Sequence, residues 1–247
     1  MVADVSILAW SLAIVGSVIL GLAKAGVKGT GVVIILLFAI AFQSKASTGI
    51  LVPLLIVGDT FAVIYYRRHA QWGMLWRLMP WVIIGVLAGV WAGKELDEGE
   101  FKRWMAILIL GSTILMIAGE FRKHVEIPRQ GFFGAVMGLL AGFATMIGNL
   151  AGPFADLYFL AMRLPKNSFI GTAAWLFFLV NLFKLPFHVF VWYTITAETL
   201  LLDLWLVPPL ILGLWGGVKI VSRIQEAPYR ILVIALTALG ALFILIA

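Results

Sequence analysis

Gly21-Leu22-Ala23-Lys24-Ala25-Gly26-Val27-Lys28-Gly29-Thr30-Gly31 places four glycines and two lysines between two apolar runs, at 5–23 and 32–42. In lipid, a charged side chain is costly, and irregular backbone must find its hydrogen-bond partners inside the protein. A glycine-rich, cationic break at this depth therefore predicts one of two things: a loop at the membrane surface, or a binding site.

A second stretch of the same kind follows about 121 residues later. It reads Gly142-Phe143-Ala144-Thr145-Met146-Ile147-Gly148-Asn149-Leu150-Ala151-Gly152-Pro153, and it too lies between apolar runs. Gly21 and Gly31 align with Gly142 and Gly152. This second copy favours the binding site, because it implies packing against a symmetry-related partner.

The composition predicts an integral membrane protein. The chain has 247 residues, of which 63% are apolar and 12% charged, and its mean hydropathy is +1.08. Soluble domains have about 45–50% apolar and about 25% charged residues.

The absence of cysteine excludes disulfides and thiolate metal sites. The net charge of +6 is scattered over short loops, so we expect no nucleic acid partner. The first apolar run lacks a preceding positive charge, and we expect it to be retained rather than cleaved as a signal peptide.

The apolar segments form two sets of five. They lie at 5–23, 30–43, 47–66, 78–93 and 104–119, and at 131–147, 150–162, 168–190, 200–218 and 231–247. The predicted organisation is thus an N-terminal repeat at 1–120, a linker at 121–130 and a C-terminal repeat at 131–247. The second segment of each set has about 13–14 residues, where a perpendicular crossing needs about 20. Short segments at matching places in two halves are typical of a transporter binding site.

Further positions match between the halves. Lys45–Gly49 aligns with Asn167–Gly171, and Asp59 then aligns with Asn181. Pro80-x4-Gly85-x3-Gly89 aligns with Pro208-x4-Gly213-x3-Gly217. Because each set has an odd number of segments, the second repeat is expected to be inverted relative to the first.

The distribution of Lys and Arg predicts the orientation. With both termini outside, the inner loops carry eleven basic residues: Arg67, Arg68, Arg77, Arg122, Lys123, Arg129, Arg163, Lys166, Lys219, Arg223 and Arg230. The outer loops carry four: Lys45, Lys94, Lys102 and Arg103. A re-entrant hairpin of the first two segments would leave the later loops on the same sides.

Several polar residues within the apolar runs are candidates for a substrate site. Lys24 and Lys28 either extend to the inner interface or face a substrate cavity. Asp59 either cancels a lysine, binds a proton or cation, or lines the pathway. For Asp156, Lys184 and His188, a purely structural role is the alternative to a role in the site. We place the candidate substrate-binding site at Lys24, Lys28, Gly29, Thr30, Gly31, Asp59, Gly148, Asn149, Gly152 and Asn181.

Helix termini would supply the binding chemistry. A short helix that begins near residues 29–31 would present unpaired N–H groups and a partial positive charge. Its copy near 148–152 would direct a second N-terminus toward the same midplane, and Pro153 suits an early helical position. Two such termini and a lysine suit a carboxylate, sulfite or sulfonate. The three histidines are dispersed, and no nucleophile elbow or P-loop occurs, so we expect no enzyme, no catalytic residue, no metal and no cofactor.

The two glycine-rich breaks, each followed by a short apolar segment, resemble the TauE/SafE sulfite and sulfonate exporter family, also called the toluene sulfonate uptake permeases. The segments Ser44–Gly49 and Ser168–Ala173, each followed by Pro-x4-Gly-x3-Gly, add to the resemblance. Members often read Gly-Gly-Gly in the breaks; this chain has Lys28-Gly29-Thr30-Gly31 and Asn149-Leu150-Ala151-Gly152 instead. The resemblance implies a secondary transporter of small sulfur-containing anions.

We therefore expect an all-α integral membrane protein of two inverted repeats that exports sulfite, sulfoacetate or related organosulfonates by alternating access. The alternatives are an anion permease of other selectivity or importing direction, and a non-transporting membrane scaffold subunit. The expected partners are a small anionic substrate and the lipid bilayer; a coupling proton or ion and a homo-oligomer are left open. The resemblance implies a bacterial inner membrane, and the loop charges place both termini outside.

Overall fold

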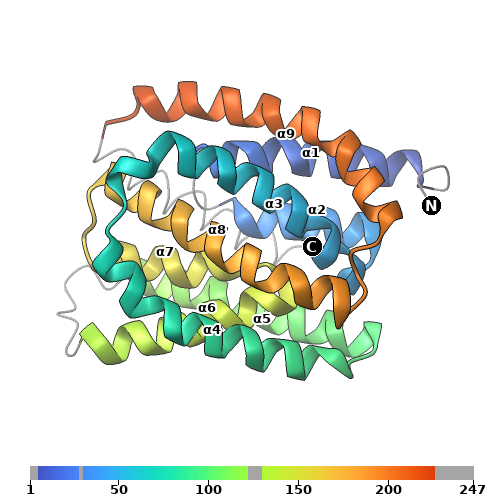
Figure 1. Ribbon diagram of the computed structural model, residues 1–247, viewed down its shortest axis with the longest axis horizontal. Coiled ribbons are helices and arrows are strands. Elements are labelled where there is room, and N and C mark those ends of the chain that lie inside the picture. Colours follow the sequence, from blue (N-terminus) through green and yellow to red (C-terminus); the bar gives the residue numbers. More distant parts are fainter. Residues whose placement is uncertain (1–4, 28–29, 122–129, 226–247) are drawn as a thin grey trace.

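The computed structural model describes residues 5–27, 30–121 and 130–225. These residues form helices connected by short turns (Figure 1). The elements are α1 (Ile7–Lys24), α2 (Gly31–Phe42), α3 (Ser44–Tyr66), the 3-10 turn η2 (Arg67–His69), α4 (Trp72–Lys94), α5 (Glu98–Phe121), α6 (Gln130–Gly148), α7 (Ala151–Ala161), α8 (Lys166–Phe190) and α9 (Ala197–Arg223). Lys28, Gly29, most of the predicted linker and the last predicted segment, 231–247, lie outside the described residues.

Six helices of the described part are long and apolar enough to cross a membrane: α1, α3, α4, α6, α8 and α9. Large apolar side chains cover their outer faces, as with Trp91 (83% exposed) and Trp205 (69% exposed). Such a surface would be unfavourable in water but is normal against lipid tails. The predicted class, an all-α integral membrane protein, is confirmed.

The second helix of each half is short. α2 has 12 residues and α7 has 11, which at 1.5 Å per residue makes each about 16–18 Å long. The hydrocarbon core is about 30 Å thick, so neither helix can cross it. α2 packs on α1 and α3, and α7 packs on α6 and α8. Gln43 (φ 72°) joins α2 directly to α3, and Asn149 (φ 57°) precedes α7.

Glycines allow α4 and α6 to pack with their backbones in contact. A Cβ atom on Gly85 would lie 2.2 Å from the carbonyl oxygen of Leu139, and one on Gly142 would lie 2.0 Å from that of Val82. Small residues at such crossings are typical of membrane helices, because close packing replaces the hydrophobic effect that lipid does not supply.

The crossing of α1 and α9 repeats this arrangement. A Cβ atom on Gly21 would lie 2.2 Å from the carbonyl oxygen of Leu210, and one on Gly213 would lie 2.0 Å from that of Val18. Gly21 and Gly213 are the residues that align with Gly142 and Gly85. Figure 1 shows the two helix pairs on opposite sides of the molecule, with α3 and α8 between them. Each pair joins one helix from each half of the chain.

α3 and α8 run antiparallel through the centre. The start of α3 meets the turn after α8, since a Cβ atom on Gly49 would lie 2.5 Å from the carbonyl oxygen of Thr194. The start of α8 meets the end of α3 in the same way, with Gly171 facing the carbonyl oxygen of Tyr66 at 2.8 Å. These matched contacts support the inverted repeat of 1–120 and 131–247, which we retain as a proposal.

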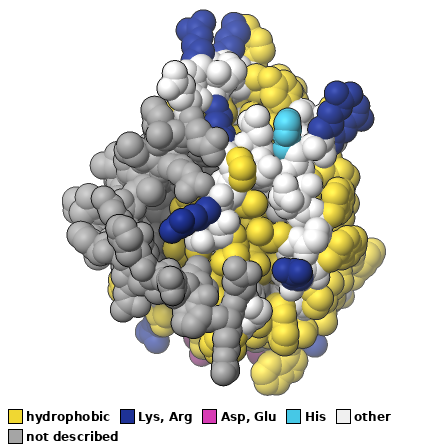
Figure 2. Space-filling view, turned by 90° about the vertical axis from the view of Figure 1, so that its left-hand side faces the viewer, with side chains coloured by type: hydrophobic (Ala, Val, Ile, Leu, Met, Phe, Trp, Pro, Cys, Tyr) yellow, Lys and Arg dark blue, Asp and Glu magenta, His cyan; other side chains and the backbone are white. Residues whose placement is uncertain are grey.

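The ends of the bundle differ in charge. The end where α3 finishes and α8 begins carries Arg67, Arg68, His69, Arg77, Arg163, Lys166, Lys219 and Arg223. Figure 2 shows Lys, Arg and His side chains across this end, with hardly any acidic side chain. The opposite end carries both signs of charge in or next to its turns: Glu95, Asp97, Glu98, Glu100 and Glu198, together with Lys45, Lys94, Lys102 and Arg103. The positive-inside rule predicts that the more basic end lies inside, and this orientation stays a prediction.

Candidate functional site

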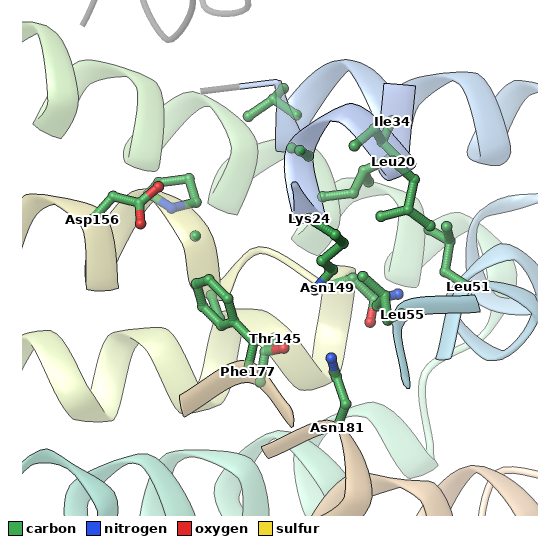
Figure 3. Close-up of a pocket in the computed structure, with 17 residues that line it drawn as sticks. Leu20, Lys24, Ile34, Leu51, Leu55, Thr145, Asn149, Asp156, Phe177 and Asn181 are labelled. Atoms are coloured by element: carbon green, nitrogen blue, oxygen red, sulfur yellow. The ribbon is translucent and has the colours of Figure 1, made fainter. Parts of the chain in front are cut away.

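A cavity of about 100 Å³ lies where the two halves meet (Figure 3). Residues from α1, α2, α3, α7 and α8, together with the end of α6 and the turn that follows it, form its wall. Its polar lining residues are Lys24, Thr145, Asn149, Asp156 and Asn181. Its apolar lining includes Leu20, Ile34, Ile35, Leu51, Leu55 and Phe177. In Figure 3 Leu20, Ile34, Leu51 and Leu55 lie on one side of Lys24, and Asp156 lies on the other.

The N-termini of both short helices reach this cavity. Gly31 and Val32 of α2 line it, as do Gly152 and Pro153 of α7. Neither N-terminus has a side-chain cap. The first N–H groups of a helix have no partner within the helix, and they carry a partial positive charge. The cavity therefore receives two positive helix ends, one from each half of the chain.

Glycine at these termini keeps the cavity open. A Cβ atom built on Gly31 or on Gly152 would meet no other atom within 4 Å. Packing of the helices therefore does not require either glycine, in contrast to Gly21 and Gly142. What the two residues provide is exposed backbone beside the cavity, which a ligand can approach closely.

Lys24 enters from the last turn of α1 and forms a buried ion pair. Its Nζ lies 2.6 Å from Asp59 Oδ1, and the two side chains are 9% and 0% exposed. Asn181 on α8 donates from Nδ2 to the other carboxylate oxygen, Oδ2, at 2.6 Å. Asp59 thus holds one residue from each half of the chain. A buried charge is tolerated when it is paired and hydrogen-bonded in this way.

Lys184 forms a second polar cluster behind the cavity wall. Its side chain is fully buried, and its Nζ donates to Thr145 Oγ1 at 3.1 Å and to Thr145 O at 3.2 Å. It also donates to Asn149 Oδ1. The amide nitrogen of Asn149 donates to Thr48 O on α3 at 3.1 Å. The cluster therefore fixes the turn that precedes α7.

The structure brings most of the predicted site residues together. Lys24, Gly31, Asn149, Gly152 and Asn181 line the cavity. Asp59 does not line it but contacts Lys24 and Asn181, and Thr30 and Gly148 lie next to lining segments without lining it themselves. The positions predicted at Lys28 and Gly29 lie outside the described residues. Contact of these side chains with a substrate stays a prediction.

Three polar residues of the site were not among the predicted site residues. Thr145 and Asp156 line the cavity and Lys184 is buried behind it; of these, Asp156 and Lys184 were considered in the sequence and left out of the predicted site. The sequence signal that could have identified Lys184 is its position inside a long apolar run, where a charge is expected to face the protein interior. The apolar side of the cavity carries no such signal, because Leu and Ile are common throughout the chain.

The sequence model of the family described as sulfite exporter TauE/SafE matches residues 10–244, which include every residue of the cavity. The chain belongs to the TauE/SafE family. No curated protein and no solved structure matches the chain. Membership confirms the resemblance seen in the sequence and makes the protein a membrane transporter of sulfite or related sulfur anions. TauE/SafE proteins are transporters rather than enzymes, as expected from the sequence.

Proposed function

We propose that this TauE/SafE protein binds a small sulfur-containing anion in the cavity between its halves and exports it by alternating access. The observation that carries the proposal is the convergence of two uncapped helix N-termini, at Gly31 and Gly152, on one cavity. Helix N-termini bind anions because their N–H groups and their dipole both favour negative charge.

The proposed substrates are sulfite, sulfoacetate and related organosulfonates. A cavity of about 100 Å³ has room for a group of this size. The apolar side at Leu20, Ile34 and Leu51 suits the carbon group of an organosulfonate, which sulfite lacks, and so favours the organosulfonates among these substrates. The substrate's sulfonate oxygens would face the N–H groups of α2 and α7, with the carbon group against the apolar side.

Movement between the two halves would expose the site to each side of the membrane in turn. The cavity lies between α1–α3 of one half and α6–α8 of the other, so rocking of one half against the other would open it. The proposed location is a bacterial inner membrane, and the loop charges favour an orientation with both termini outside. A coupling proton or ion would determine the direction of substrate transport. The alternative is a permease that uses the same site to import the anion.

Ligand-induced thermal stabilisation of the purified protein tests the proposal. A ligand that binds only the folded state raises stability by about 2.7 kcal/mol at a hundred times its dissociation constant. We expect sulfite, sulfoacetate or methanesulfonate to raise the melting temperature of the wild type, and acetate to do so less. Gly31→Ala should reduce the shift without lowering the melting temperature of the ligand-free protein. If no sulfur anion stabilises the protein, the substrate class proposed here is wrong. Flux of the stabilising ligand into proteoliposomes then separates a transporter from a binding protein.

A further inference from the structure

Lys24 and Lys184 are buried lysines with different electrostatic surroundings. Lys24 is paired with Asp59 at 2.6 Å, so its charge is compensated within the protein. Among the described residues, no carboxylate lies within 4.0 Å of Lys184 Nζ. Its partners there are the neutral oxygens of Thr145 and Asn149. A buried ammonium group without a carboxylate in contact is unfavourable, and a nearby anion relieves that cost.

The hydrogen bonds of Lys184 also determine which atoms its neighbours can offer to a ligand. Thr145 Oγ1 accepts from Lys184, which leaves the hydroxyl proton to be donated elsewhere. Asn149 Oδ1 accepts from Lys184, so its amide nitrogen is directed away and donates to Thr48 O with one of two N–H groups. Thr145 and Asn149 both line the cavity. Each of these two side chains therefore keeps one donor, a hydroxyl or an amide N–H, that the hydrogen bonds named here do not use.

We propose that Lys184 is a positioning residue that makes the cavity selective for an anionic ligand. It supplies a positive charge that no carboxylate of the described residues contacts within 4.0 Å, and it holds Thr145 and Asn149 so that each keeps a donor for a sulfite or sulfonate oxygen. These donors lie beside the N-terminus of α7, so the hydroxyl, the amide and the helix N–H groups act on the same oxygens. The inference deepens the proposed function and rests on it: Lys184, rather than the compensated Lys24, distinguishes an anion from a neutral molecule of the same shape.

The test compares methanesulfonate with dimethyl sulfone, a neutral molecule of similar size and shape, by calorimetric titration of the full-length protein in detergent. We expect the wild type to bind methanesulfonate at least about tenfold more tightly, which corresponds to about 1.4 kcal/mol. Lys184→Gln keeps a hydrogen-bond donor but removes the charge. This variant should lower the affinity for methanesulfonate by about tenfold or more and leave the affinity for dimethyl sulfone unchanged. The ratio of the two affinities should therefore approach one.

The matched control is Lys45→Gln, since Lys45 lies at the start of α3, away from the cavity, and its Nζ donates to the backbone carbonyls of Lys94 and Leu96. It should keep the wild-type ratio. A normal ratio in Lys184→Gln would overturn the inference while leaving the proposed function standing, because the wild type would still bind the anion. If the wild type binds neither compound, or both equally, this inference fails, and in the first case the proposed function fails with it. Should Lys184→Gln not fold, Thr145→Val removes the oriented hydroxyl, and an unchanged ratio in that variant likewise overturns the inference.

Discussion

Asn181 Nδ2 donates to Asp59 Oδ2 at 2.6 Å, and these two residues occupy aligned positions in the two halves of the chain. Residues related by a two-fold axis can contact each other only where they lie close to that axis. In the proposed inverted repeat, the two-fold axis that relates the halves would therefore pass near the middle of α3 and α8, next to the cavity. Asp59 also holds Lys24, so the centre of the molecule is a polar group of three side chains in a largely apolar surrounding.

The ion pair of Lys24 and Asp59 should behave as a unit. Removing one partner leaves a buried charge, which costs about 3–5 kcal/mol, whereas replacing both with apolar residues is often neutral. We expect Asp59→Leu to lower the melting temperature strongly and Lys24→Met/Asp59→Leu to recover most of the loss, measured by thermal unfolding in detergent. Additive losses in the double variant would show that the two side chains act independently.

The cavity glycines should tolerate alanine structurally but not functionally. A Cβ atom on Gly31 or Gly152 meets nothing within 4 Å, and alanine favours a helix over glycine by up to about 1 kcal/mol. Gly31→Ala and Gly152→Ala should therefore keep or slightly raise the melting temperature and reduce anion binding by about tenfold or more, since about 1.4 kcal/mol of lost contact suffices. Gly73→Ala is the control, because its Cβ atom also meets nothing but lies at the start of α4, away from the cavity. Unchanged anion binding in both cavity variants would show that the helix N-termini do not take part in binding.

The crossing glycines should show the opposite behaviour. A Cβ atom on Gly213 would lie 2.0 Å from the carbonyl oxygen of Val18, so Gly213→Ala must separate α1 from α9. We expect a loss of about 1–3 kcal/mol, the usual cost of overpacking, seen as a lower melting temperature. Gly216→Ala in the same helix is the control, since its Cβ atom would approach no closer than 3.9 Å to Leu22. Equal melting temperatures would indicate that the two helices do not pack as closely as described.

The orientation in the membrane can be tested cleanly because the chain contains no cysteine. Arg68→Cys lies at the basic end and Glu95→Cys at the acidic end, and both positions are exposed. An impermeant thiol reagent applied to intact cells should label Glu95→Cys and spare Arg68→Cys until the membrane is opened. Labelling in the reverse order would invert the predicted topology.

Much of the fold follows from the sequence alone. The apolar composition determines that the chain lies in a membrane, and the length of each apolar run determines which helices can cross it. The repeated glycine-rich breaks predict two short helices whose N-termini carry Gly31 and Gly152, and the structure places both beside one cavity. These features depend on residues close together in the chain, so local pattern is enough to find them.

The pairing of the buried polar groups depends on the tertiary structure. Asp59 contacts Lys24 and Asn181, which lie 35 and 122 residues away in the sequence. Lys184 donates to Thr145, which lies 39 residues away. No local pattern distinguishes a lysine that is neutralised by a carboxylate from one that has only neutral partners. That difference arises from which helices cross in the bundle, and the crossings are decided by close backbone contact at Gly21, Gly85, Gly142 and Gly213. The sequence by itself determined that a few charged residues interrupt the apolar runs; the packing of the two halves decided that Lys24 contacts a carboxylate and that Lys184 contacts the neutral oxygens of Thr145 and Asn149.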